Sequence, residues 1–176
     1  MPEKNINSTT MLPAALRPTP DESGMTVPQL LEHRINALFE QIPLVAELGE
    51  AFAQAGHDLY LVGGSVRDAL MGRLGHDLDF TTDARPDDTE AILRQHTHAT
   101  WDIGRAFGTI GAQIDDWVVE VTTYRADAYH PDSRKPEIVY GETLKDDLIR
   151  RDFTVNAMAL HAATRTFSDP YAGLTL

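Results

Sequence analysis

The chain has 176 residues, of which 42% are hydrophobic and 24% are charged, as is usual for one globular domain. It has no cysteine, no apolar run near the roughly 20 residues that a membrane span needs and no secretory-signal pattern, so disulfides and thiolate zinc sites are excluded and we expect a cytoplasmic protein outside the membrane. The net charge of −12, from 27 acidic and 15 basic residues, argues against strong nucleic-acid binding through overall charge. Either a basic surface lies on a part outside this chain, or its own partners are a nucleotide and a metal ion.

The N-terminal part of the chain predicts a tail and two helices. Residues 1–27 mix Pro, Ser, Thr and charge without periodicity, which predicts a disordered tail before a domain over residues 28–176. From Pro28 to the break at Pro43, apolar residues recur on one helical face. A second helix follows and ends at Gly56.

The remainder of the chain alternates strand and helix patterns. A strand over His57–Val62 leads through two glycines to a helix over Val66–Met71, for which Ser65 is the expected N-cap. The following elements are a strand over Asp77–Thr82, a helix over Asp87–Arg94, strands over Thr97–Trp101, Phe107–Ile114 and Trp117–Tyr124, a polar loop over 125–136, a helix over Glu142–Ile149, a helix from near Asp152 and a small hairpin of Ala159–His161 with Arg165–Phe167. Without regular βαβ spacing, this order predicts an α+β domain with a mixed or antiparallel sheet flanked by helices.

Two glycines stand between the first strand and its helix. Gly63 and Gly64 let the backbone turn tightly and approach a ligand, and the N–H groups that follow can bind phosphate. Ser65 and Arg67 lie in the same turn, where Arg67 could reach phosphate or pair with a carboxylate. The alternative is a tight turn with a structural arginine, and the P-loop spacing is absent.

Asp77 and Asp79 lie two residues apart on a predicted strand, so their side chains share a face. Two like charges there repel unless a cation bridges them, and oxygen-only ligands suit Mg²⁺ or Mn²⁺. An exposed Asp-x-Asp at a strand edge is the alternative. If the strand that carries Glu120 lies beside this one, Glu120 becomes a third carboxylate; otherwise it is a polar residue of an edge strand.

A further motif runs Arg150-Arg151-Asp152-Phe153-Thr154-Val155-Asn156. Its arginines suit bidentate contacts to a triphosphate, Asp152 can cap the following helix, and Asn156 lies four residues on, on the same helical face. The alternative is a salt-bridged start of a helix.

Together, residues 61–73, 77–82, 120–125 and 150–159 resemble the signature of class II tRNA nucleotidyltransferases. These are the bacterial-type CCA-adding enzymes and their poly(A) polymerase relatives, within the polymerase beta superfamily. The resemblance extends from about Leu59 to Leu174, with the motifs in the family's order. It implies a polymerase beta-like head domain that adds CMP and AMP, from CTP and ATP, to the 3′ end of tRNA and releases pyrophosphate.

The resemblance also implies roles for single residues. Asp77 and Asp79, with Glu120 as a further carboxylate, would carry two Mg²⁺ ions in a two-metal phosphoryl transfer. The remaining residues would contact the incoming nucleotide: Gly63, Gly64, Ser65, Arg67, Arg150, Arg151, Asp152 and Asn156. The loop at 125–136 matches the loop implicated in the switch from C to A addition.

The chain departs from the family at its end, because the neck, body and tail regions and the neck's Glu-Asp-x-x-Arg base-selecting motif do not occur in it. We therefore expect a head-only chain, whose activity in isolation is open. A poly(A) polymerase shares every motif present. Two other classes stay as alternatives: a nucleotide-binding module without catalysis, and a sugar-nucleotide transferase, against which the absence of βα units before the Asp pair counts.

Overall fold

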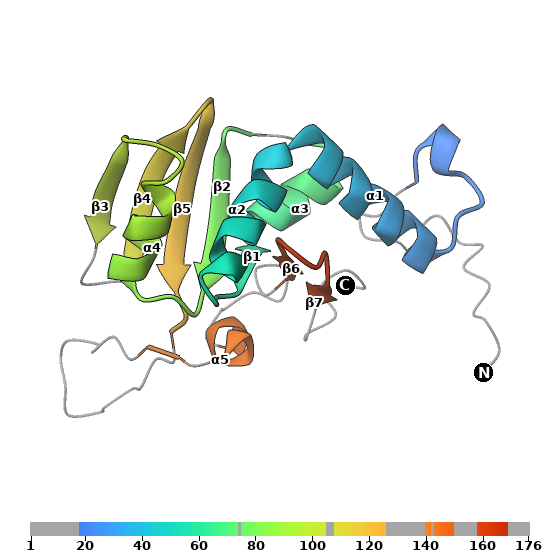
Figure 1. Cartoon of the computed structure of the whole chain (residues 1–176). Coiled ribbons are helices and arrows are strands. Elements are labelled where there is room, and N and C mark those ends of the chain that lie inside the picture. Colours follow the sequence, from blue (N-terminus) through green and yellow to red (C-terminus); the bar gives the residue numbers. More distant parts are fainter. Residues whose placement is uncertain are drawn as a thin grey trace.

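The computed structural model describes residues 18–73, 75–104, 108–125, 140–141, 143–149 and 158–168. Within them, one sheet has the strand order β3-β4-β5-β2-β1-β6-β7. Adjacent strands of this sheet run antiparallel, except for β2 and β5, which run parallel. The predicted α+β class with a mixed sheet is confirmed (Figure 1).

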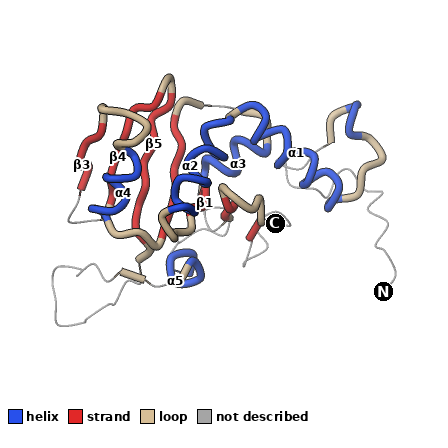
Figure 2. Tube along the Cα trace, viewed as in Figure 1, coloured by secondary structure: helices blue, strands red, loops and turns tan. Residues whose placement is uncertain are grey.

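The elements follow the predicted order (Figure 2). The helices are η2 (Pro20–Glu22), α1 (Val27–Gln41), α2 (Pro43–Gln54), α3 (Gly64–Leu70), α4 (Pro86–Leu93) and α5 (Leu144–Ile149). The strands are β1 (Leu59–Val62), β2 (Asp77–Thr82), β3 (Thr100–Gly104), β4 (Thr109–Ile114), β5 (Trp117–Thr123), β6 (Ala159–His161) and β7 (Phe167–Ser168). The helix predicted near Asp152 lies outside the described residues. No described helix is long and apolar enough to cross a membrane.

Strand β3 starts three residues later than the sequence predicts. The Thr97 hydroxyl donates a hydrogen bond to the Gln113 carbonyl at 2.7 Å and accepts one from the Ala99 N–H at 3.1 Å. This local turn occupies the backbone before the strand, so pairing with β4 begins only at Thr100. The β4–β5 hairpin turns at Asp115-Asp116, with Asp115 at φ 52°.

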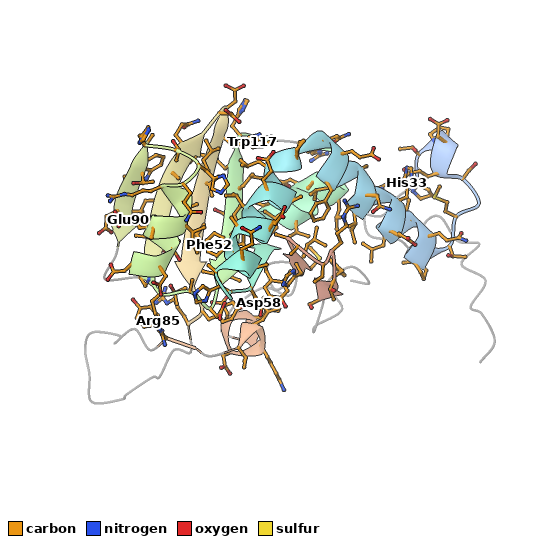
Figure 3. The ribbon with its side chains drawn as sticks, viewed as in Figure 1. His33, Phe52, Asp58, Arg85, Glu90 and Trp117 are labelled. Carbon is orange, nitrogen blue, oxygen red and sulfur yellow. The ribbon has the colours of Figure 1, made fainter. Side chains whose placement is uncertain are left out.

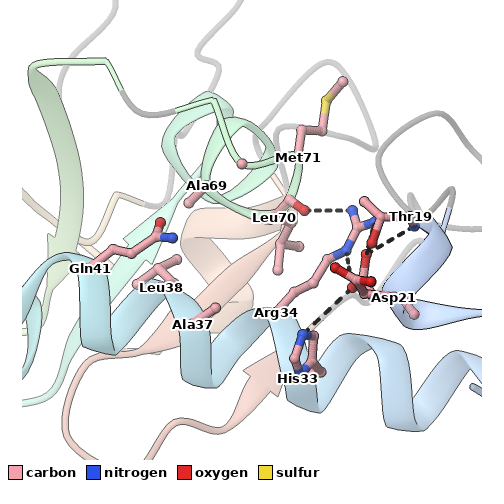
Figure 4. Close-up of a pocket in the computed structure, with 12 residues that line it drawn as sticks. Thr19, Asp21, His33, Arg34, Ala37, Leu38, Gln41, Ala69, Leu70 and Met71 are labelled. Carbon is pink, nitrogen blue, oxygen red and sulfur yellow. Dashed lines mark hydrogen bonds and ion pairs between the residues drawn. The ribbon is translucent and has the colours of Figure 1, made fainter.

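Residues 18–27, predicted to belong to a disordered tail, contain η2 and the first residue of α1. Arg34 on α1 donates from Nε to the Glu22 carboxylate at 3.1 Å and from Nη1 to the Leu70 carbonyl at 2.7 Å (Figure 4). The Glu22 side chain is 7% exposed. The sequence pattern misses this stretch because its order depends on a partner twelve residues along the chain, not on local periodicity.

One face of the sheet is covered and the other carries polar side chains. Helices α2, α3 and α4 lie on the same side of the sheet in Figure 1, over a core that includes Phe52, Leu61, Phe80 and Val121. Phe52 is labelled among these side chains in Figure 3. On the opposite face, α5 packs through Leu148 against Val62 of β1. The part of that face on β2, β5, β4 and β3 holds the site described next.

Candidate active site

The turn from β1 into α3 depends on Gly63. Its backbone has φ 65° and ψ −137°, a conformation that is essentially restricted to glycine. Gly63 is the N-cap of α3, and no side chain caps the helix. The predicted capping role of Ser65 is therefore wrong, because Gly63 ends the turn earlier and α3 already begins at Gly64. The Ser65 hydroxyl instead accepts a hydrogen bond from the Asp79 N–H at 3.0 Å, which fixes α3 against β2.

Strand β2 presents its two aspartates on one face. Asp77 and Asp79 are exposed, whereas Leu78 and Phe80 between and beyond them are 3% and 2% exposed and lie in the core. Alternation along the strand thus separates the two carboxylates from the core, as the sequence predicts.

Strand β5 brings a third carboxylate to the same face. It pairs in parallel with β2, and the register sets Glu120 directly opposite Asp79. The condition under which Glu120 joins the aspartates, that its strand lies beside theirs, is therefore met. Paired residues of neighbouring strands project to the same side, so Asp77, Asp79 and Glu120 form one acidic cluster on the sheet.

The electrostatics of this cluster are unfavourable without a cation. Partial burial raises the pKa of the Glu120 carboxyl, and the charges of Asp79 and Asp77 and a hydrogen bond to Asp79 raise it further. Among the described residues, no three Asp, Glu, His or Cys side chains converge closely enough to hold a metal ion as they stand. The oxygen-only donors and the mutual repulsion nevertheless fit a divalent cation, which would relieve the repulsion.

The nucleotide-binding residues predicted on α3 lie next to this cluster. A Cβ at Gly64 would make an ordinary van der Waals contact with the end of the Arg67 side chain, whose Nη2 would lie 3.8 Å away. The Arg67 side chain is 43% exposed, and its Nε lies 3.4 Å from an Asp68 carboxylate oxygen. Both expected uses of Arg67, phosphate contact and a carboxylate pair, remain compatible with this position. The predicted contacts Arg150, Arg151, Asp152 and Asn156 lie outside the described residues.

A pocket of about 250 Å³ joins α3 to the start of β2. Gly64, Ser65, Asp77 and Asp79 line it. Its other lining residues include Asp68, Arg73 and Trp117, which are not among the predicted site residues. Asp68 and Arg73 lie within residues 61–73, one of the stretches that resemble the family, so this stretch could have identified both. Trp117, which is labelled at the start of β5 in Figure 3, lies in no such stretch.

Comparison with known proteins shows the family of this chain. The family model described as the poly A polymerase head domain matches residues 59–175. The chain is 48% identical over 112 residues to the CCA-adding enzyme of Staphylococcus haemolyticus, covering 63% of this chain and 27% of that protein. It is 41% identical over 133 residues to the CCA-adding enzyme of Staphylococcus aureus strain MRSA252, covering 74% and 31%.

Solved structures that share the fold include the following two. The Bacillus stearothermophilus CCA-adding enzyme in complex with CTP aligns at a TM-score of 0.61 and 34% identity, over 77% of this chain and 30% of that one. A tRNA nucleotidyltransferase complexed with a primer tRNA and an incoming ATP analog aligns at 0.57 and 32%, over 72% and 35%. The chain thus spans about a third of the length of these relatives.

Proposed function

Because the chain belongs to the poly A polymerase head-domain family, we propose that it is the catalytic part of a template-independent RNA nucleotidyltransferase that completes the 3′ end of tRNA with CMP and AMP from CTP and ATP. The observation that carries this proposal is the parallel pairing of β2 with β5, which sets Glu120 opposite Asp79 beside the α3 turn. The relatives named CCA-adding enzymes favour CCA addition over poly(A) synthesis.

In this proposal, Asp77 and Asp79 hold Mg²⁺, or Mn²⁺, and Glu120 is a further ligand. The bound ions supply the two-metal chemistry that activates the RNA 3′-hydroxyl and neutralises charge on the phosphates. The protein's own contribution is to fix the carboxylates. The Ser65 hydroxyl holds the Asp79 backbone, and the β2–β5 ladder sets the spacing between Asp79 and Glu120. A rigid cluster of this kind needs little reorganisation during the reaction.

The residues around the α3 turn bind the triphosphate in this proposal. Gly64 has no side chain of its own to block a close approach, and the partly exposed guanidinium of Arg67 can donate to phosphate oxygens. Arg73, on the wall of the same pocket, adds a second positive charge. Arg150, Arg151, Asp152 and Asn156 are proposed, from the family resemblance, to contact the sugar or the phosphates.

The experiment is nucleotide incorporation by the complete protein on a tRNA transcript that lacks its terminal CCA. We expect incorporation of C from CTP and then A from ATP, with chelation of divalent cations stopping both. Long A tracts made without CTP would identify a poly(A) polymerase. Binding of CTP without any incorporation would instead identify a nucleotide-binding module and overturn the enzymatic proposal.

A further inference from the structure

Two large apolar side chains on the edge strand β3 are partly exposed to solvent. Trp101 is 39% exposed and Ile103 is 47% exposed, and Met25 is the only other large hydrophobic residue with comparable exposure in the described part of the chain. Edge strands usually carry charged or polar residues that limit unwanted pairing. An exposed indole beside an exposed isoleucine at this edge therefore points to a contact.

The strand register places this apolar pair on the face that carries the acidic cluster. Trp101 pairs with Gly111, Gly111 pairs with Glu120, and Glu120 pairs with Asp79. Cross-strand partners project to the same side, so one row of side chains runs from the exposed indole to the proposed metal ligands. Neighbouring strands lie about 4.8 Å apart, so β3 lies roughly 10 Å from the strand of Glu120.

Because Gly111 has no side chain, Trp101 and Ile103 can lie closer to Glu120 than this spacing of the strands suggests. A Cβ built on Gly111 would lie 2.6 Å from Trp101 Cε2 and 2.9 Å from Ile103 Cδ1, so both side chains lean over the glycine. Gly111 is the immediate cross-strand neighbour of Glu120. The indole and the isoleucine thus extend over β4 toward the acidic cluster.

Packing alone accounts for part of this arrangement. Aromatic side chains that cover a glycine on a neighbouring strand stabilise sheet edges. This accounts for the covered side of the indole, but the exposed areas of Trp101 and Ile103 stay without a partner in the described residues.

We propose that Trp101 and Ile103 form a stacking platform for an unpaired base at the 3′ end of the RNA acceptor. This inference rests on the proposed function. The pocket for the triphosphate is lined mainly by α3 and the first residues of β2 and reaches β5 only at Trp117, whereas Trp101 lies on the edge strand β3, beyond Glu120. Phosphoryl transfer sets the attacking and the leaving oxygen on opposite sides of the phosphorus, so the RNA end approaches from the side of the platform.

Stacking also suits the charge of this chain. An aromatic platform binds the faces of bases and tolerates any base, so it adds RNA affinity that does not come from phosphate contacts. A chain with a net charge of −12 can therefore contribute to positioning an RNA end through stacking, although its overall charge does not favour phosphate contacts.

The first experiment compares Trp101→Ala, Trp101→Leu and Trp101→Phe in the complete protein. For Trp101→Ala we expect the KM for the acceptor RNA to rise roughly five- to tenfold, which is the low end of the effect of losing one stacked base, while the KM for CTP and the kcat at saturating RNA stay within about twofold. Phe retains a ring and should restore RNA affinity, whereas Leu retains only apolar bulk and should not. Equal KM values for the Leu and Phe variants would overturn the stacking role. Thermal unfolding of each variant identifies any loss of folding.

The second experiment uses photocrosslinking with an iodinated pyrimidine at the RNA 3′ end. We expect the adduct on Trp101, mapped by mass spectrometry, and its loss in the Leu variant. An adduct at Trp101 from an iodinated CTP instead of the RNA would overturn the assignment of the occupant. If the wild-type protein incorporates nucleotides but Trp101→Ala leaves the KM for RNA unchanged, only the platform fails. If the wild type incorporates none, the proposed function fails and the platform with it.

Discussion

The ion pair between Glu22 and Arg34 allows a quantitative test of how much the contacts of the N-terminal segment stabilise the folded chain. Two nitrogens of Arg34 donate to the Glu22 carboxylate at 3.1 and 3.2 Å, and a third donates to the Leu70 carbonyl at 2.7 Å (Figure 4). Thr19 donates to the same carboxylate from its N–H and its hydroxyl, at 3.1 and 2.8 Å. One carboxylate thus connects η2 to α1, and Arg34 extends the connection to the C-terminal end of α3.

These contacts lower the pKa of Glu22 from 4.5 to about 2. The hydrogen bonds from Arg34 are the main cause; burial opposes the shift, and the bonds from Thr19 add to it. A pKa unit corresponds to about 1.4 kcal/mol, so the full shift would stabilise the folded chain by about 3 kcal/mol. The side chains of Arg34 and Glu22 are only 12% and 7% exposed, but a Gln at position 22 would keep one acceptor oxygen for Arg34, so we expect the substitution to remove about 1–2 kcal/mol.

Urea unfolding of Glu22→Gln and wild-type chains measures this contribution. Because the folded pKa is depressed, the stabilisation is fully present above pH 4.5 and is lost as the pH falls toward about 2. We therefore expect Glu22→Gln to lower the free energy of unfolding by about 1–2 kcal/mol at pH 7 and by less than half of that at pH 2.5. Glu32→Gln, exposed on α1, the helix that carries Arg34, is the control. Equal free energies of unfolding for the Glu22 and Glu32 variants at pH 7 would refute the reasoning.

Three further predictions concern Gly49, Gly63 and Glu120. Gly49→Ala should lower the free energy of unfolding, measured in urea, by about 1–3 kcal/mol, because the new Cβ would lie 2.6 Å from the Ala162 carbonyl oxygen. Glu50→Ala on the same helix is the control, and an equal loss of stability in that variant would contradict the predicted steric clash. Gly63→Ala should cost about 1–3 kcal/mol of backbone strain and reduce the kcat/KM for CTP, whereas an unchanged kcat/KM would show that the turn does not position the nucleotide. Glu120→Gln should raise the free energy of unfolding of the metal-free chain at pH 7, because the raised pKa of Glu120 means that its charged form disfavours folding. This gain in stability should shrink below pH 4.5, and added Mg²⁺ should reduce the difference in stability between the variant and the wild type. A lower free energy of unfolding for the metal-free variant would contradict the repulsion between Glu120 and the two aspartates.

The parts of the site that the sequence predicts are those set by local pattern. The alternation Asp77-Leu78-Asp79-Phe80 fixes which side chains face the core, and Gly63 next to Gly64 marks a turn that only glycine can make. Both need no knowledge of the rest of the chain, and both agree with the structure.

The parts that depend on distant partners could not be predicted in the same way. The pairing of Asp79 with Glu120 joins residues 41 positions apart in the chain through a parallel ladder, so the sequence could state it only as a condition. Ser65 follows N-cap preferences, yet its hydroxyl bonds to the Asp79 N–H across the fold. The position of Trp101 over Gly111 depends on a register that no local pattern reveals.

Asp77 and Asp79 carry the central claim, that this sheet face holds divalent cations for nucleotide transfer. The decisive measurement is CMP incorporation into a tRNA lacking CCA by the complete protein with Asp77→Ala and Asp79→Ala combined, beside Asp88→Ala on the helix-covered side as the control. We predict a fall of about a thousandfold or more for the double variant, and activity within about twofold of wild type for the control. Activity of the double variant near wild type would contradict the account.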